Sequence, residues 1–139
     1  MDIPNSLISS SIERGCILHS HGFTDIDHGK FFVVIGIKGN KVAGFFFINS
    51  SINHSLFNKP EQLALQYQLK KNDYSFLRYD SFLCASSLLT MSLDELTEDI
   101  QNSTAKIVDK LKESHINEIL ESVRKSRLYS KAEKRDFFY

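Results

Sequence analysis

The sequence lacks an apolar run long enough to cross a membrane. A transmembrane helix needs roughly 20 apolar residues, whereas the longest apolar runs here, residues 31–37 and 44–48, have only the length of a strand. The sequence also lacks a basic segment followed by an apolar stretch near its first residue, the pattern of a secretory signal. We therefore expect a cytoplasmic protein with no membrane partner.

Cysteine is scarce, because only Cys16 and Cys84 occur and they lie far apart in the sequence. Two isolated cysteines do not form the disulfide framework that supports small secreted domains, so we expect both thiols to be reduced and buried. The sequence has no internal repeat and no low-complexity segment. Its 139 residues, 42% of them apolar, predict a single domain with a hydrophobic core.

An excess of charge of either sign is also missing. The 17 basic and 17 acidic residues give a formal net charge of zero, so the total charge does not indicate a nucleic-acid partner. Basic residues nevertheless gather in the last segment, which predicts either a solvated helix end or a contact surface for phosphate or an acidic partner. These residues are Arg124, Lys125, Arg127, Lys131, Lys134 and Arg135.

Short segments of strand character follow one another through the first two thirds of the chain. Residues 15–21 alternate in polarity, and residues 31–37 form a continuous run of β-branched and aromatic residues, typical of a buried strand. Gly39 and Asn40 then predict a tight hairpin turn into a strand over residues 42–49. Further strands are expected over residues 63–69, whose leucines alternate with polar residues, and twice within residues 75–91.

The pattern changes to a helical one at Ser92. Ser92 and Glu95 have the spacing of a capping box, and Leu93, Leu96 and Ile100 follow at helical spacing. Apolar residues between positions 107 and 123 continue this spacing, which predicts a helical C-terminal part. Strands followed by helices in one small unit predict an α+β protein, with an antiparallel barrel or sheet and a helical tail.

Three segments, in this order along the chain, resemble the MazF/PemK-type toxin endoribonucleases. Residues 14–21 (RGCILHSH) are similar to the start of the family's first strand, and residues 29–36 (GKFFVVIG) to its strand of pattern G-x-R-P-x-L-V-I. Residues 80–96 (DSFLCASSLLTMSLDEL) are similar to the family's Asp-Ser start, strand, threonine with an apolar residue, and helix. Lys30 and Phe31 stand where the family has arginine and proline.

The resemblance implies an SH3-like β-barrel of the CcdB/MazF-like superfamily, assembled as a homodimer. It also implies a metal-independent endoribonuclease without a cofactor, which cuts single-stranded RNA and is inhibited by a cognate antitoxin in a type II toxin–antitoxin system. The family's catalytic arginine aligns with Lys30, and its catalytic threonine or serine with Asn49 or Ser50.

Pattern and resemblance together predict an α+β protein with a small antiparallel SH3-like β-barrel followed by C-terminal helices. In this interpretation residues 1–13 are an N-terminal extension that includes a short helix, residues 14–91 form the barrel, and residues 92–139 form the helical tail.

Metal-free RNA cleavage needs a group that removes the proton of the attacking 2′-hydroxyl, a fixed positive charge near the phosphoryl oxygens, and a proton for the leaving 5′-oxygen. Lys30 can supply the charge, although its ammonium lacks the two parallel hydrogen bonds of a guanidinium. Nearby polar groups can donate hydrogen bonds, and histidines such as His19 can move protons near neutral pH. The catalytic candidates are Lys30, Asn49, Ser50 and His28, and the substrate-binding candidates are His21, Ser51 and Asn53.

The predicted hairpin supports this site, because Lys30 begins one of its strands and Asn49 ends the other. Antiparallel pairing places these two ends side by side, so we expect them to border one phosphate site. Ordinary structural roles are the alternative: Lys30 as a solvated strand end, Asn49 and Ser50 as turn residues that bond their own backbone, and His28 as an exposed loop residue.

Two other functions are compatible with the sequence. His19 and His21 lie two residues apart and share a face on a strand, so that Asp25 or His28 could complete a metal site in a metal-dependent enzyme. A toxin-like barrel could also be non-catalytic and act by binding a protein, as gyrase-directing toxins of the same superfamily do. The phenylalanines of the central strands could stack on bases or fill the core, and the terminal RDFFY segment is expected to dock onto the body or a partner subunit.

Overall fold

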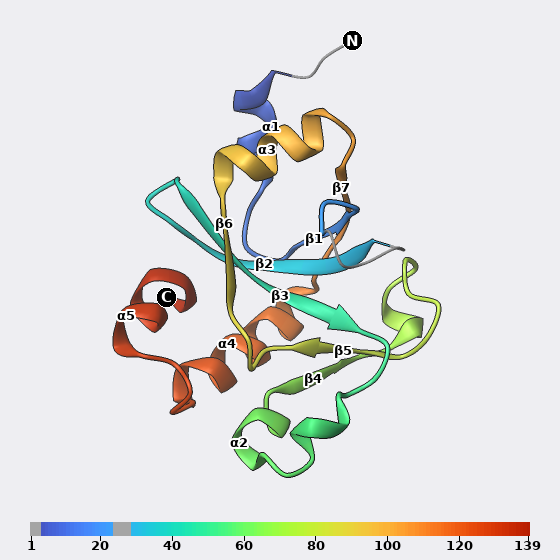
Figure 1. Ribbon diagram of the computed structural model, residues 1–139, viewed down its shortest axis with the longest axis vertical. Helices are drawn as coiled ribbons and strands as arrows, with labels where there is room; N and C mark the ends of the chain where they lie inside the picture. Colours follow the sequence, from blue (N-terminus) through green and yellow to red (C-terminus); the bar gives the residue numbers. More distant parts are fainter. Residues whose placement is uncertain (1–3, 24–28) are drawn as a thin grey trace.

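The computed structural model of the protein describes residues 4–23 and 29–139 (Figure 1). It is an α+β structure, as the sequence predicts, with one antiparallel sheet and helices packed on it. The strands found in the described residues are β1 (Cys16–Ser20), β2 (Lys30–Lys38), β3 (Val42–Asn49), β4 (Gln66–Leu69), β5 (Ser81–Cys84), β6 (Leu89–Ser92) and β7 (Ala105–Lys110).

The sheet follows the order β4-β5-β3-β2-β1-β7, and β6 pairs with β3 beside this path. β3 divides one edge between two partners, pairing with β6 through residues 42–45 and with β5 through residues 48–49. The pairings of the described strands form an open sheet and do not close into the expected barrel. A barrel built from residues 14–91 would need one of its own strands on the outer edge of β1, but β7 occupies that edge.

The helices lie on both faces of the sheet (Figure 1). Their bounds are α1 (Asn5–Ser11), α2 (Pro60–Leu63), α3 (Leu93–Gln101), α4 (Glu113–Lys125), α5 (Lys131–Glu133), the 3₁₀ helices η1 (His54–Leu56) and η2 (Lys71–Asp73), and the terminal π-helix η3 (Lys134–Phe138). None of the helices within residues 4–23 and 29–139 is long and apolar enough to cross a bilayer.

Alternation along the strands produces two hydrophobic cores, one on each face of the sheet. On one face Leu18 and Phe32 pack with residues of α1 and α3, including Ile8 and Leu96. On the other face Ile17, Val33 and Phe46 pack with α4 and the C-terminal segment through side chains such as Ile119, Val123 and Phe138. The alternation also decides which side chains of β1, β2 and β3 point toward the site described below.

Two local predictions are confirmed by the backbone. Gly39 and Asn40 have φ angles of 55° and 56°, the left-handed values of the hairpin turn that joins twisted strands, and β2 pairs with β3 on either side of them. Ser92 caps α3, since its side chain accepts a hydrogen bond from the Glu95 backbone N–H at 3.3 Å. The short helix expected within residues 1–13 is α1.

The helical register predicted between positions 107 and 123 is wrong in its first part. Residues 105–110 form strand β7, which pairs antiparallel with β1, and only α4 has the predicted helical conformation. Ser103, with φ of 63°, ends the preceding helix, and the β-branched pair Ile107 and Val108 suits a strand. The strand predicted over residues 63–69 is also shorter than expected, because Pro60 opens α2 and leaves only β4.

Two of the three terminal aromatic residues dock onto the body, as expected, whereas Tyr139 is exposed. Phe137 and Phe138 are buried, and a Cβ atom on Gly36 would lie only 2.1 Å from the Phe137 carbonyl oxygen. Glycine at this position therefore lets the C-terminal segment approach β2 closely. Arg14 donates hydrogen bonds to the backbone oxygens of Ile35 at 2.7 Å and of Phe137 at 3.2 Å, which joins the first strand region to the last helix.

Candidate functional site

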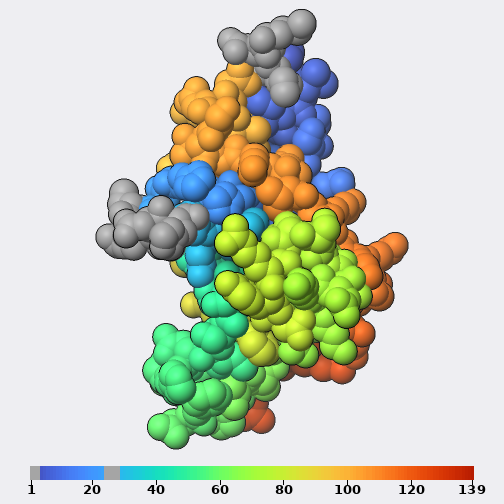
Figure 2. All heavy atoms as spheres, turned by 90° about the vertical axis from the view of Figure 1, so that its right-hand side faces the viewer, coloured from blue at the N-terminus to red at the C-terminus, as the bar shows by residue number. Residues whose placement is uncertain are grey.

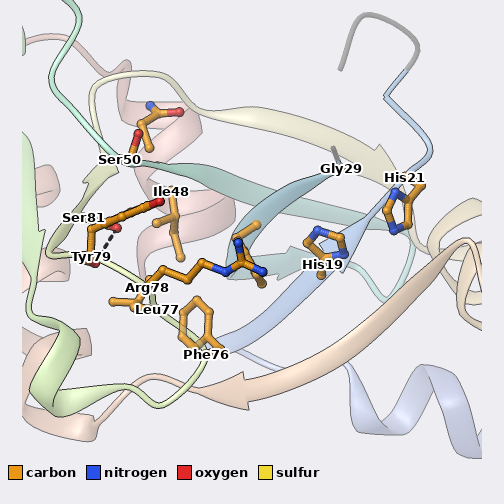
Figure 3. Close-up of a pocket in the computed structure, with 12 residues that line it drawn as sticks. His19, His21, Gly29, Ile48, Ser50, Phe76, Leu77, Arg78, Tyr79 and Ser81 are labelled. Atoms are coloured by element: carbon orange, nitrogen blue, oxygen red, sulfur yellow. Dashed lines mark hydrogen bonds between the residues drawn. The ribbon is translucent and has the colours of Figure 1, made fainter. Parts of the chain in front are cut away.

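A pocket of about 760 Å³ lies where the ends of β1, β2 and β3 meet the loop that precedes β5 (Figure 3). In Figure 2 the yellow-green loop around residue 75 lies close to the blue residues of β1. The polar groups of the pocket come from three places: the histidines of β1 and its end, the end of β3, and the loop. Its lining comprises His19, His21, Gly29, Phe31, Ile48, Asn49, Ser50, Phe76, Leu77, Arg78, Tyr79 and Ser81.

The strand register places His19 in the pocket. His19 pairs with Phe31 of β2, which in turn pairs with Ile48 of β3, and residues directly opposite in antiparallel strands share a face. The rings of His19 and Phe31 are 4.6 Å apart between centroids. His21 is two residues further and points to the same side, with its ring 4.7 Å from that of His19 in an edge-to-face arrangement. The pocket therefore contains two imidazoles in contact.

Backbone contacts fix the positions of these imidazoles. The His21 N–H donates to the Thr104 carbonyl oxygen at 2.9 Å, which anchors the end of β1 to the residue that precedes β7. Gly29 has a φ of 76°, and a Cβ atom there would lie 2.6 Å from Cε1 of His19 and 3.0 Å from Nδ1 of His21. A glycine is thus needed both for the left-handed backbone and for close approach to the two rings.

The predicted convergence of Lys30 and Asn49 is present in the structure. The Lys30 ammonium donates a hydrogen bond to Oδ1 of Asn49 and lies 5.3 Å from the centroid of the Phe47 ring. Burial lowers the pKa of Lys30, and a weaker interaction with Cys84 opposes this shift. Asn49 lines the pocket but Lys30 does not. Side chains of successive strand residues point to opposite faces, so Lys30 and Asn49, which neighbour Phe31 and Ile48, have their side chains on the face of Phe47, away from the imidazoles. Their hydrogen bond joins the ends of β2 and β3 on that face.

The other predicted site residues are only partly brought together. Ser50 lines the same pocket as His21 and Asn49, whereas Ser51 and Asn53 lie in the following loop outside the lining. The Asn53 side chain accepts a hydrogen bond from the Ser55 N–H at 3.0 Å and caps η1, which is a structural role. The predicted catalytic residue His28 lies outside the described residues.

Arg78 is the functional group that the sequence prediction missed. It is exposed in the loop before β5, and Figure 3 shows its side chain reaching across the pocket toward His19. Its guanidinium forms no hydrogen bond or ion pair with any described residue. The loop around it is held by the Lys71 N–H, which donates to Asp80 at 2.8 Å, and by Ser81, which donates to the Tyr79 carbonyl oxygen at 3.0 Å.

The metal alternative keeps only two of its proposed ligands in the described residues, His19 and His21. Asp25 and His28, which could have completed the set, lie outside them. No group of three or more histidine, cysteine, aspartate or glutamate side chains within residues 4–23 and 29–139 is placed to hold a metal ion.

The described groups therefore offer an anion site rather than a cation site. One unpaired guanidinium, two adjacent imidazoles and the hydroxyl of Ser50 lie around a space whose described lining residues include no carboxylate. A phosphodiester is an anion of suitable chemistry, because its oxygens accept the hydrogen bonds of all these groups. No protein-family model matches the chain, and no curated protein matches it either. The inference about function accordingly depends on the geometry of this pocket.

Proposed function

We propose that the protein is a metal-independent endoribonuclease that cuts single-stranded RNA, like the MazF/PemK-type toxins that its sequence resembles. The observation that supports this most strongly is the pair of imidazoles, 4.7 Å apart, in one pocket with the unpaired guanidinium of Arg78. Two groups that move protons and one fixed cation are what metal-free cleavage of a phosphodiester requires.

The roles follow from the chemistry of the reaction. One of His19 and His21 takes the proton of the ribose 2′-hydroxyl as its oxygen attacks phosphorus. The bond from phosphorus to the 5′-oxygen breaks, and the other imidazole gives that oxygen a proton, which leaves a cyclic phosphate and a 5′-hydroxyl. Arg78 neutralises the charge that develops on the phosphoryl oxygens, and the Ser50 hydroxyl donates a hydrogen bond to one of them.

Arg78, rather than Lys30, is the proposed phosphate cation. A guanidinium can form two parallel hydrogen bonds with a phosphate, and Arg78 lines the pocket whereas Lys30 does not. Lys30 becomes a positioning residue, since its bond to Oδ1 of Asn49 holds together the ends of β2 and β3, whose neighbouring residues Phe31, Ile48 and Ser50 line the pocket. An arginine from the loop thus takes the place of the arginine that the family has at the start of the second strand.

The test is cleavage of a labelled single-stranded RNA by purified protein in the presence of EDTA. We expect the wild type to cleave the RNA under these conditions. The rate should fall by 10²-fold or more in His19→Ala, His21→Ala and Arg78→Ala, which is the usual order for loss of an acid, a base or a charge-stabilising group. Lys41→Ala, in the hairpin turn at the other end of β2 and β3, is the matched control and should keep full activity. Absence of cleavage by the wild type, or its loss on chelation, would refute the proposal.

The remaining properties of the toxin class are part of the same proposal. We propose that the protein acts in the cytoplasm as a homodimer, that a cognate antitoxin inhibits it, and that its sheet corresponds to an SH3-like barrel opened between β4 and β7. The continuous antiparallel run of β1, β2, β3 and β5 supports this relationship. Sedimentation of the purified protein measures the dimer, and growth arrest on expression in bacteria measures toxicity.

A second candidate is a non-catalytic toxin-like protein that acts by binding another protein. It is favoured by a groove of about 420 Å³ on the other face of the sheet, lined by aromatic side chains and by two carboxylates of α3. The aromatic side chains are in mutual contact, with the rings of Phe23 and Phe47 5.0 Å apart, and burial, with Glu95 and Glu98 adding to it, raises the pKa of Asp99. Growth arrest that survives in the His19→Ala/His21→Ala double variant would favour this function over RNA cleavage.

A further inference from the structure

Beside the pocket, the same face of the sheet carries a cation on the edge strand β7. His19 pairs with Phe31 on one side and with Lys106 of β7 on the other. Directly opposed residues of an antiparallel pair share a face, so Lys106 stands beside His19 on the face that holds the pocket. Val108, two residues further along β7, packs on the core of this same face, which agrees with the assignment.

Lys106 is available for a ligand. Its residue is exposed, and its ammonium makes no hydrogen bond or ion pair with any residue that the structure describes. By contrast Lys110, four residues along the same strand, donates to a carboxylate oxygen of Glu13 at 2.7 Å, and Lys112 contacts Asp73 at 3.2 Å. Of these three lysines, Lys106 is nearest to the imidazoles, and it is the one without an acidic partner among the described residues.

We propose that Lys106 forms a second phosphate subsite, which binds a phosphate of the RNA next to the one that is cleaved. This inference deepens the proposed function and rests on it. Neighbouring strands lie roughly 5 Å apart, and a stacked nucleic-acid strand carries one charge per roughly 3.4 Å. Lys106 therefore lies one or two nucleotides from a phosphate held between Arg78 and His19, and the RNA crosses β1 from the Arg78 loop to the edge of β7.

The subsite predicts a dependence on substrate length. A dinucleotide with a single phosphate fills only the cleavage site, so Lys106→Ala should cleave it as fast as the wild type does. On an RNA of eight or so nucleotides the same variant should lose about tenfold in kcat/KM, since a cationic contact to phosphate is missing, and Lys106→Arg should retain the rate. Lys41→Ala, which also removes an exposed lysine, is the control that should match the wild type on both substrates.

Binding provides a second readout that does not need catalysis. With a 2′-O-methyl RNA, which cannot be cleaved because the attacking hydroxyl is blocked, the slope of log K against log salt concentration should become shallower by about 0.7 in Lys106→Ala, the value for one phosphate contact of a single strand. An unchanged slope, or an equal loss of rate on the dinucleotide and the longer RNA, would overturn the subsite while leaving the nuclease intact. A wild type that neither cleaves nor binds RNA would overturn the nuclease and the subsite together.

Discussion

At the scale of single residues, the site combines groups whose meeting could be predicted with one that could not. Lys30 and Asn49 flank a hairpin that the sequence shows clearly, so their contact follows from antiparallel pairing. His19 lies on β1 and His21 directly follows its last residue, so the two side chains, two residues apart, lie on one side and their rings are in contact. Arg78 belongs to a loop with no periodicity, and only the tertiary position of that loop brings its guanidinium to the imidazoles.

The hydrogen bond between Lys30 and Asn49 yields a prediction about coupling. If Lys30 and Asn49 act by holding the ends of β2 and β3 together beside the pocket, then Lys30→Met and Asn49→Ala remove the same interaction. We expect each variant to lower kcat/KM by about 10- to 100-fold, and the double variant to lose no more than the worse single one, because coupled residues are not additive. Steady-state kinetics of the four proteins measures this.

Additive losses in that cycle would contradict the positioning role and would assign Lys30 a contact of its own with the RNA. Circular dichroism of each variant is the control for folding. Lys30→Arg supplies a further comparison, since a guanidinium keeps the charge and can still donate to Oδ1 of Asn49.

At the scale of elements, the strands and helices differ in the sequence separation of the residues that stabilise them. The hairpin and the capped helix α3 are decided by residues close together in sequence, and both were predicted. β7 was not, since its apolar residues also fit a helical spacing and its strand conformation depends on pairing with β1, more than 80 residues earlier. Local pattern therefore identified the elements with local causes, and missed the strand that has a distant partner.

The C-terminal segment is the element whose removal should be costly. Phe138 is fully buried, with its ring 4.9 Å from Tyr129 and 6.1 Å from Phe46. Phe138→Ala should lower the free energy of unfolding by about 3–5 kcal/mol, the range for a buried phenylalanine that leaves a cavity. Tyr139→Ala is the matched control: its ring is 73% exposed and contacts Arg124 by a cation–π interaction that contributes about 1 kcal/mol or less. Urea denaturation of both variants measures the difference, and equal costs would show that η3 is not part of the core.

At the scale of the whole molecule, composition and patterning predicted the α+β class, and the structure confirms it. The sheet does not close into the predicted barrel, because β7 pairs with the outer edge of β1. The whole fold also separates charge by face. Among the described residues, none of those that line the proposed RNA pocket is acidic, whereas the groove on the opposite face is bordered by Glu95 and Asp99 of α3. A chain with zero net charge can thus present an anion site, because the balance is set locally and not by the total.

The free energy of unfolding should depend on pH through the thiol of Cys16, which lies on the face of the sheet opposite the proposed RNA pocket. Burial is the main cause that raises the pKa of Cys16 from 9.0 to about 11, and its side chain packs in the core beneath α1 and α3. Because the folded state holds this proton more tightly than the unfolded state, the thiol's contribution is fully present below pH 9 and is lost as the pH rises toward 11. The shift corresponds to about 3 kcal/mol of unfolding free energy over that interval. Urea denaturation of the wild type and Cys16→Ala across pH 8–11 isolates this contribution, since every other titrating group is common to both proteins. If the difference in unfolding free energy between the two proteins stays constant with pH, Cys16 ionises in the folded state as readily as in the unfolded one, and the prediction is wrong.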